Sequence, residues 1–208
     1  MSVLKYFLFL EEIVMINEEV VMNDIYKFPS DFVSAQFVKY IEQSEIENIT
    51  KSLAATLNER YKGEELVIIG ALKGSLLFLS DLLKHLQNIK VYVDFVHLNS
   101  VGRDKESHGT ITLNKDIKTN VMGKNVLIVE EIVDTGRALH FLKSRIQQSS
   151  PRSVELLTLF DKPYKRVVPL KPDYIGKQID DQFIIGYGLD LEEYGRNISD
   201  IYYLKYPN

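Results

Sequence analysis

The sequence contains no cysteine and no tryptophan among its 208 residues. Without cysteine the chain can form neither disulfides nor thiolate metal sites, which fits a reducing compartment. No stretch approaches the roughly 20 consecutive apolar residues that a membrane-spanning helix needs. The apolar residues 6–10 end at Glu11 and Glu12 without a small-residue cleavage pattern, so we expect no secretory signal and a cytoplasmic protein.

A strong excess of basic charge is also missing, since the formal net charge is -4. The chain therefore has no bulk attraction for nucleic acid or for an anionic membrane, and we expect neither as a partner. Its 45% hydrophobic and 26% charged residues are typical of one globular domain with a sizeable core. Residues 1–22 are either a disordered N-terminal extension or part of the fold, because chain termini are often poorly ordered.

Continuous apolar segments alternate with amphipathic segments along the chain. A continuous apolar run predicts a strand buried on both faces, and spacing of three to four residues predicts a helix. This order predicts an α/β fold with a mainly parallel sheet, whose sites lie beyond the carboxyl ends of the strands. The predicted strands are residues 66–69, 91–98, 110–113, 126–129, 154–160, 183–190 and 201–204, and the predicted helices are residues 45–60, 76–86 and 137–145.

The segment 126–139 combines a buried strand with a polar turn and a helix start. Four apolar residues are followed by Glu130, Glu131 and Asp134, and then by Thr135 and Gly136. A strand that ends in a glycine turn and opens a helix points free backbone N–H groups at one spot, where an anion can bind. The preceding carboxylates could hold a divalent cation. The simpler alternative is a capped helix start beside exposed strand-end charges.

Two further segments are candidates for function. Residues 70–75 again join a buried strand to a helix through glycines, but Lys73 precedes its glycine, so the segment is not a Walker A loop. Residues 99–109 have no apolar periodicity and carry five charged or ionisable side chains. Long loops of this kind are often functional, and we expect a mobile loop here.

These motifs together resemble those of a known enzyme family. Residues 126–139 are similar to the phosphoribosyl pyrophosphate motif of the type I phosphoribosyltransferases, and residues 72–75 resemble their pyrophosphate loop. Lys162 and residues 183–196 resemble the purine site of hypoxanthine-guanine phosphoribosyltransferases. The resemblance covers about residues 40–205 in the family's order. It implies purine salvage: hypoxanthine or guanine attacks C1 of phosphoribosyl pyrophosphate with Mg²⁺, giving the nucleoside monophosphate and pyrophosphate.

The resemblance also implies an architecture. It is a five-stranded parallel core with helices on both faces, together with a small hood built from both chain ends. Residues 23–208 would form one domain, with a core over about residues 45–165 and a hood from about residues 23–44 and 166–208. Members of the family form homodimers or homotetramers, so the same is expected here.

The resemblance assigns roles to individual residues of the reaction centre. Asp134 would be the base near purine N7, and Glu130 and Glu131 would bind the ribose hydroxyls and the magnesium, with Asp190 near the metal through water. The Leu72–Lys73 peptide would be cis. The residues implied to bind phosphoribosyl pyrophosphate are Glu130, Glu131 and Asp134 together with Lys73, Gly74, Ser100, Thr135, Gly136, Arg137, Ala138, Leu139 and Arg196.

The purine site is implied by four residues. Lys162 would donate to the exocyclic O6 of the base, which distinguishes a 6-oxopurine from adenine because adenine would present a donor to a donor. Phe183 would stack on the ring, and Ile184 and Asp190 would offer backbone carbonyls to its edge. Read without the family, Lys162 is a solvated loop lysine and Phe183 a core residue.

Three positions depart from the family pattern. Glu131 replaces the aspartate of the usual Glu-Asp pair, Ser75 stands where a second glycine is common, and Val101 replaces the lid tyrosine. Two other functions stay open: a xanthine-accepting enzyme, and a nucleotide-binding regulator of RNA or DNA. The regulator would need a basic face or an added DNA-binding segment, and the acidic charge balance argues against it.

Overall fold

The computed structural model describes residues 36–101 and 110–205, so the expected extension over residues 1–22 lies outside the described residues. The chain divides into two compact units. One contains residues 44–181, and the other contains residues 1–43 together with 182–208. No helix in the described ranges is both long and apolar enough to span a bilayer.

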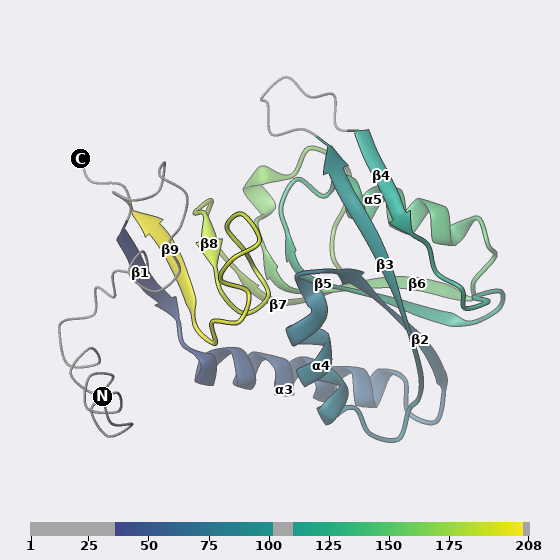
Figure 1. Ribbon diagram of the computed structural model, residues 1–208. Helices are drawn as coiled ribbons and strands as arrows, with labels where there is room; N and C mark the ends of the chain where they lie inside the picture. Colours follow the sequence, from purple (N-terminus) through teal and green to yellow (C-terminus); the bar gives the residue numbers. More distant parts are fainter. Residues whose placement is uncertain (1–35, 102–109, 206–208) are drawn as a thin grey trace, which may run out of the picture. The chain divides into compact units, whose positions relative to one another are not determined.

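The larger unit is built on a six-stranded sheet with the order β4-β3-β2-β5-β6-β7 (Figure 1). Five strands run parallel, which confirms the predicted parallel core, and β4 adds an antiparallel edge. The strands are β2 (Glu65–Leu72), β3 (Lys90–Val101), β4 (Thr110–Lys115), β5 (Asn125–Val133), β6 (Ser153–Asp161) and β7 (Tyr174–Gln178).

Helices cover both faces of this sheet, as predicted. The helices α3 (Gln43–Arg60) and α4 (Ser75–His85) lie on one face, and α5 (Arg137–Gln147) lies on the other (Figure 1). On the α5 face, Ile128 of β5 belongs to the same buried cluster as Leu142. On the α4 face, a Cβ atom on Gly70 would lie 2.7 Å from Leu79 Cδ2, so glycine lets α4 approach β2 closely.

The strand β5 lies at the centre of the sheet, between β2 and β6. Its residues 126–129 are fully buried because both neighbours and both helical layers cover them. This explains why the segment shows no alternation of apolar and polar residues. At the carboxyl end, Val133 pairs with Asp161 of β6. The residues that follow, Asp134 and Lys162, therefore start from adjacent strand ends.

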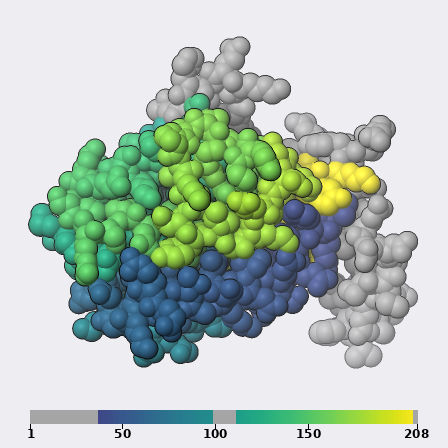
Figure 2. Space-filling view, turned by 180° about the vertical axis from the view of Figure 1, so that it is seen from behind, coloured from purple at the N-terminus to yellow at the C-terminus, as the bar shows by residue number. Residues whose placement is uncertain are grey.

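The strand β7 was not predicted, because residues 161–171 were interpreted as the start of a basic, proline-containing connection. None of its five residues is fully buried, so it has no continuous apolar run. Contacts with α3 hold it at the sheet edge: Lys177 pairs with Glu45, and Gly176 leaves room for Ile49. In Figure 2 the light-green surface around β7 adjoins the blue surface of α3.

The smaller unit contains an antiparallel sheet with the order β1-β9-β8. Its strands are β1 (Gln36–Ile41), β8 (Ile184–Ile185) and β9 (Ile201–Lys205). The predicted strand over residues 183–190 is wrong beyond two residues, because Gly186 turns with φ +110° and bonds across to Leu189. The strand β1 was missed, since its aromatic surroundings show no clear period. The two units divide at 43/44 and 181/182, so β7 belongs to the larger unit.

A half-buried carboxylate joins α3, β6 and β7 in the larger unit. Glu155 accepts hydrogen bonds from Tyr61 Oη at 2.6 Å and from the Tyr174 hydroxyl, and it pairs with Arg60 at 3.0 Å. Burial alone would raise the pKa of Glu155, but the two hydroxyls and the Arg60 charge together lower it. The ionised carboxylate therefore stabilises the folded chain.

We expect Glu155→Gln to lower the free energy of unfolding at neutral pH by about 1–3 kcal/mol, because two hydroxyls lose a charged acceptor. Urea denaturation at pH 7 measures this. A folded-state pKa below the unfolded value means that the contribution is complete above about pH 5 and disappears as the pH falls below about 4. The difference in unfolding free energy between the wild type and Glu155→Gln should therefore shrink as the pH falls below about 4.

The control is Glu47→Gln, which removes an exposed ion pair to Lys51 at 3.9 Å. Such a pair contributes at most about 0.5 kcal/mol on a helix. An equal effect of the two substitutions would contradict the structural role given to Glu155.

Candidate functional site

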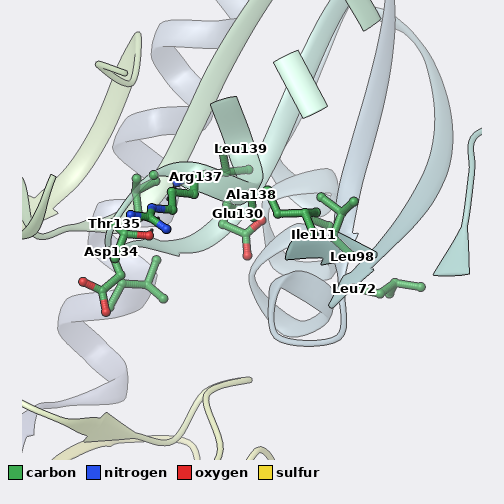
Figure 3. A pocket seen from close by; sticks show the side chains of 13 residues that line it. Leu72, Leu98, Ile111, Glu130, Asp134, Thr135, Arg137, Ala138 and Leu139 are labelled. Atoms are coloured by element: carbon green, nitrogen blue, oxygen red, sulfur yellow. Dashed lines mark hydrogen bonds between the residues drawn. The ribbon is translucent and has the colours of Figure 1, made fainter. Parts of the chain in front are cut away.

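A pocket of about 240 Å³ opens beyond the carboxyl end of β5. Figure 3 shows the Glu130 side chain between the turn that starts α5 and the apolar side chains of Leu72, Leu98 and Ile111. One side of the pocket therefore carries a carboxylate and the start of a helix, and the other side is apolar. Its complete lining is Ala71, Leu72, Leu98, Ile111, Glu130, Ile132, Val133, Asp134, Thr135, Gly136, Arg137, Ala138 and Leu139.

The turn before α5 has the geometry of an anion site. Gly136 precedes the helix with φ +80°, a conformation that glycine adopts readily and other residues rarely do. The first N–H groups of any helix lack acceptors within the helix, and here Arg137, Ala138 and Leu139 begin α5 on the pocket wall. Converging N–H groups and the helix dipole favour an anionic group at this position. All six turn residues predicted to bind phosphoribosyl pyrophosphate, residues 134–139, line this one pocket.

Glu130 and Glu131 bring two carboxylates together at the end of β5. Burial raises the pKa of Glu130 well above its usual value, and the adjacent Glu131 carboxylate, through its charge and a hydrogen bond, raises it further. A divalent cation would relieve this crowding of negative charge. In the described ranges no three histidine, aspartate or glutamate side chains are arranged to hold a metal. The pair nevertheless fits Mg²⁺, which is usually bound through one or two carboxylates and substrate phosphates.

The Glu131 side chain reaches the predicted pyrophosphate loop. It is 9% exposed, and its carboxylate occupies the space that a Cβ atom on Gly74 would need. Gly74 has φ -61°, so this close approach and not an unusual backbone angle calls for glycine. The Leu72–Lys73 peptide is cis, which confirms the expectation from the resemblance. Ser75 donates to the carbonyl of Ala71 at 2.6 Å and closes the loop.

Asp134 offers one carboxylate oxygen as a proton acceptor. Its Oδ2 lies 3.4 Å from Lys165 Nζ, which also pairs with Asp181 Oδ1 at 2.6 Å. Its Oδ1 is shielded from solvent, and no donor in the described part of the chain bonds to it. Burial lowers the pKa of Lys165, but the carboxylates of Asp181 and Asp134 outweigh that effect and raise it. A positive charge therefore stays beside Asp134.

Lys162 follows β6 and is only 5% exposed, so the alternative of a solvated loop lysine is wrong. Its backbone N–H donates to the carbonyl of Val133 at 3.0 Å, which continues the pairing of β5 with β6. Burial lowers the pKa of the Lys162 amine, although the charge of Asp134 opposes this. The Lys162 side chain is therefore buried, and its charge interacts with that of Asp134.

The remaining predicted site residues belong to the smaller unit, except Ser100, which lies in β3. Phe183 is 47% exposed, so its interpretation as a core residue is wrong, whereas Ile184 is buried. Arg196 pairs with Asp190 at 2.9 Å and donates to the carbonyl of Gly188 at 2.8 Å. The predicted roles of Ser100, Phe183, Ile184, Asp190 and Arg196 stay predictions.

No role was predicted for Asp161, Lys165 or Arg166, which the structure places around Asp134. Lys165 and Arg166 were interpreted as part of a basic connection. The available signal was position: basic residues that follow a buried strand in a parallel sheet arise at the edge where sites form. Residues 163–165 form a short 3-10 helix that turns the chain back toward Asp134.

Comparison with known proteins agrees with this geometry. The model of the phosphoribosyl transferase domain matches residues 39–192. The chain belongs to this family. A hypoxanthine-guanine phosphoribosyltransferase of Staphylococcus aureus strain Mu50 is 39% identical over 165 residues, which cover 79% of this chain and 92% of the relative.

Solved structures of phosphoribosyltransferases have the same fold. A hypoxanthine-guanine phosphoribosyltransferase of Bacillus anthracis is 40% identical with a TM-score of 0.74, over 80% of this chain and 97% of the other. A hypoxanthine phosphoribosyltransferase of Trypanosoma cruzi is 33% identical with a TM-score of 0.76, over 83% and 96%. The predicted fold class is therefore confirmed.

We expect Gly74→Ala to raise the KM of this phosphoribosyltransferase for phosphoribosyl pyrophosphate by about tenfold or more, which corresponds to at least about 1.4 kcal/mol of binding. The added Cβ would displace the Glu131 carboxylate. Steady-state kinetics measures the effect. The double variant Gly74→Ala/Glu131→Asp should recover part of the loss, because the shorter side chain leaves room for the methyl group.

The control is Gly123→Ala, since Gly123 has φ +69° and open space around its Cβ position. That substitution strains the backbone by about 1 kcal/mol but should leave KM unchanged. A normal KM for Gly74→Ala would contradict the contact between Glu131 and the loop.

Proposed function

We propose that this chain transfers the 5-phosphoribosyl group of phosphoribosyl pyrophosphate to hypoxanthine or guanine, in purine salvage. The observation that carries the proposal is the juxtaposition of Asp134 and Lys162. Each follows one of two paired strands, β5 and β6, and Asp134 lies on the wall of the anion pocket. The relatives named hypoxanthine-guanine phosphoribosyltransferase support the same reaction.

In this proposal Asp134 holds the proton of purine N7. Its Oδ1 is the oxygen that no described donor occupies, and its Oδ2 is held by Lys165. Acid–base catalysis contributes about 10²–10⁴-fold, or about 3–5 kcal/mol, whereas enzymes usually lower the barrier by about 8 kcal/mol or more. The larger share must therefore come from positioning the two substrates and stabilising charge.

The turn at residues 134–139, the phosphate loop, would position phosphoribosyl pyrophosphate. The N–H groups at the start of α5 would bind the 5-phosphate, with the Thr135 hydroxyl beside them. Glu130 and Glu131 would hold the ribose hydroxyls and a magnesium ion. When bound, that ion would supply positive charge to the leaving pyrophosphate. Lys73 and Gly74, which lie next to Glu131, would bind the pyrophosphate.

Lys162 would select the base. A buried ammonium group gains from an acceptor, and O6 of hypoxanthine or guanine is an acceptor, whereas the 6-amino group of adenine donates. Sites built around a hydrogen bond reject a mismatched analogue strongly, by up to about 10⁴–10⁵-fold. The exposed ring of Phe183 is available to stack on the base, and the carbonyls of Ile184 and Asp190 would meet its edge.

The experiment that tests the function is an assay with four bases in the presence of phosphoribosyl pyrophosphate and Mg²⁺. We expect kcat/KM for hypoxanthine and guanine to exceed that for xanthine, and adenine to be a poor substrate. A preference for adenine would contradict the role of Lys162. Nucleotide binding without turnover of any base would favour the regulator instead.

We expect Asp134→Asn to lower kcat by about 10²–10⁴-fold, because the amide cannot accept the proton, while binding of phosphoribosyl pyrophosphate changes little. Calorimetry and steady-state kinetics measure the two quantities. Unchanged turnover would remove the assignment of Asp134 as the base. The homodimer or homotetramer expected from the resemblance is tested separately by sedimentation velocity.

A further inference from the structure

Arg166 has a guanidinium group that is largely shielded from solvent and touches two parts of the site. The side chain is 12% exposed, and it pairs through one terminal nitrogen with Asp161, whose side chain is 4% exposed. The other terminal nitrogen donates to the backbone carbonyl of Asp134 at 2.6 Å. One side chain therefore bonds both the last residue of β6 and the residue that follows β5.

The stem of Arg166 and the next residues continue this contact. A Cβ atom on Gly136 would lie 2.8 Å from Arg166 Cδ, so the stem covers the glycine of the phosphate loop. Val167 donates its N–H to the carbonyl of Thr135 at 3.1 Å. Residues 166 and 167 thus run along residues 134–136 and hold the loop through two consecutive carbonyls.

These bonds fix a direction as well as a position. In a trans peptide the C=O and the following N–H lie in one plane and point in opposite directions. Because Arg166 holds the carbonyl of Asp134, the N–H of Thr135 points away from Arg166. A guanidinium group presents its donors in a rigid fork, so it holds two acceptors in fixed relative orientation, which a lysine cannot do. The N–H groups for the phosphate are therefore oriented before a ligand binds.

We propose that Arg166 is a positioning residue that couples the phosphate loop to the purine-selecting lysine. It orients the Asp134–Thr135 peptide on one side and holds Asp161, the residue before Lys162, on the other. This inference rests on the proposed function, and it adds a residue outside the pocket wall. Loss of the guanidinium should affect binding of phosphoribosyl pyrophosphate and choice of base together.

The test compares Arg166→Lys and Arg166→Ala with the wild type. For Arg166→Lys we expect KM for phosphoribosyl pyrophosphate to rise about 10- to 100-fold, a loss typical of a slightly misplaced site, with a smaller effect on kcat at saturation. The ratio of kcat/KM for hypoxanthine to that for adenine should fall as well. Millimolar guanidine should restore part of the activity of Arg166→Ala and none of that of Asp134→Asn.

The control is Arg152→Lys, at the residue before β6. The guanidinium of Arg152 pairs with Glu64, the residue before β2, at 3.1 Å, and both side chains are exposed. The substitution should leave both parameters unchanged. Should Arg166→Ala fold poorly, Arg166→Lys keeps the buried charge and still decides the question. A normal KM and a normal base ratio in folded Arg166→Lys would overturn the proposal.

Amide hydrogen exchange separates this inference from the proposed function. Arg166→Lys should speed exchange in peptides that cover residues 134–139 and 161–165 of the unliganded protein, with no change in α3. If the wild type transfers phosphoribose to no base, the function fails, but the exchange pattern still decides whether Arg166 orients the loop. Unchanged exchange at residues 134–139 would overturn the inference whether or not the enzyme is active.

Discussion

The pairing of the carboxyl ends of β5 and β6 is the constraint on which the candidate site depends. Val133 pairs with Asp161, and the bond from Lys162 N–H to the carbonyl of Val133 extends the pairing by one residue. Because both strands are buried on both faces, neither can shift without exposing apolar surface. Asp134 and Lys162, which follow these paired strand ends, are thus held close together by backbone bonds.

Charged side chains gather at this edge of the sheet. Their arrangement favours ligand binding and does not serve only to stabilise the fold. Glu130 and Glu131 bring two carboxylates together at the end of β5, and burial raises the pKa of Glu130 well above its usual value. Lys162 is a buried cation at the adjacent strand end. Perturbed ionisable groups around one pocket are typical of binding and catalytic sites. Glu155, by contrast, is surrounded by Arg60 and two tyrosines, and its role is structural.

Much of the fold could be predicted from the sequence, because buried parallel strands have continuous apolar runs and covering helices have regular spacing. Residues 66–69 and 126–129 satisfied this condition, and both lie in central strands. The strand β7 did not, since an edge strand buries little and its contacts with Glu45 and Ile49 of α3 are far away in the sequence. The strand β1 pairs with β9 at the other end of the chain, which no local pattern reveals.

The site was predictable where motifs are contiguous and less so where contacts are distant. Residues 134–139 form one pocket wall, as their order indicated. Glu131 looked like a mere departure from the family pattern, but its longer side chain reaches Gly74, which no rule of spacing could show. Arg166 was missed because its two partners precede it by 5 and 32 residues, on separate strand ends.

The central claim is that the phosphate loop and Lys162 belong to one ligand site, and NMR titration of the amide signals tests it most directly. Addition of inosine monophosphate should shift the amides of residues 135–139 and of Lys162 together, with a common dissociation constant. The hollow lined by Asp116, Asn120 and Arg145 serves as the comparison region. Shifts centred on that hollow, or shifts at residues 135–139 without any at Lys162, would contradict the account.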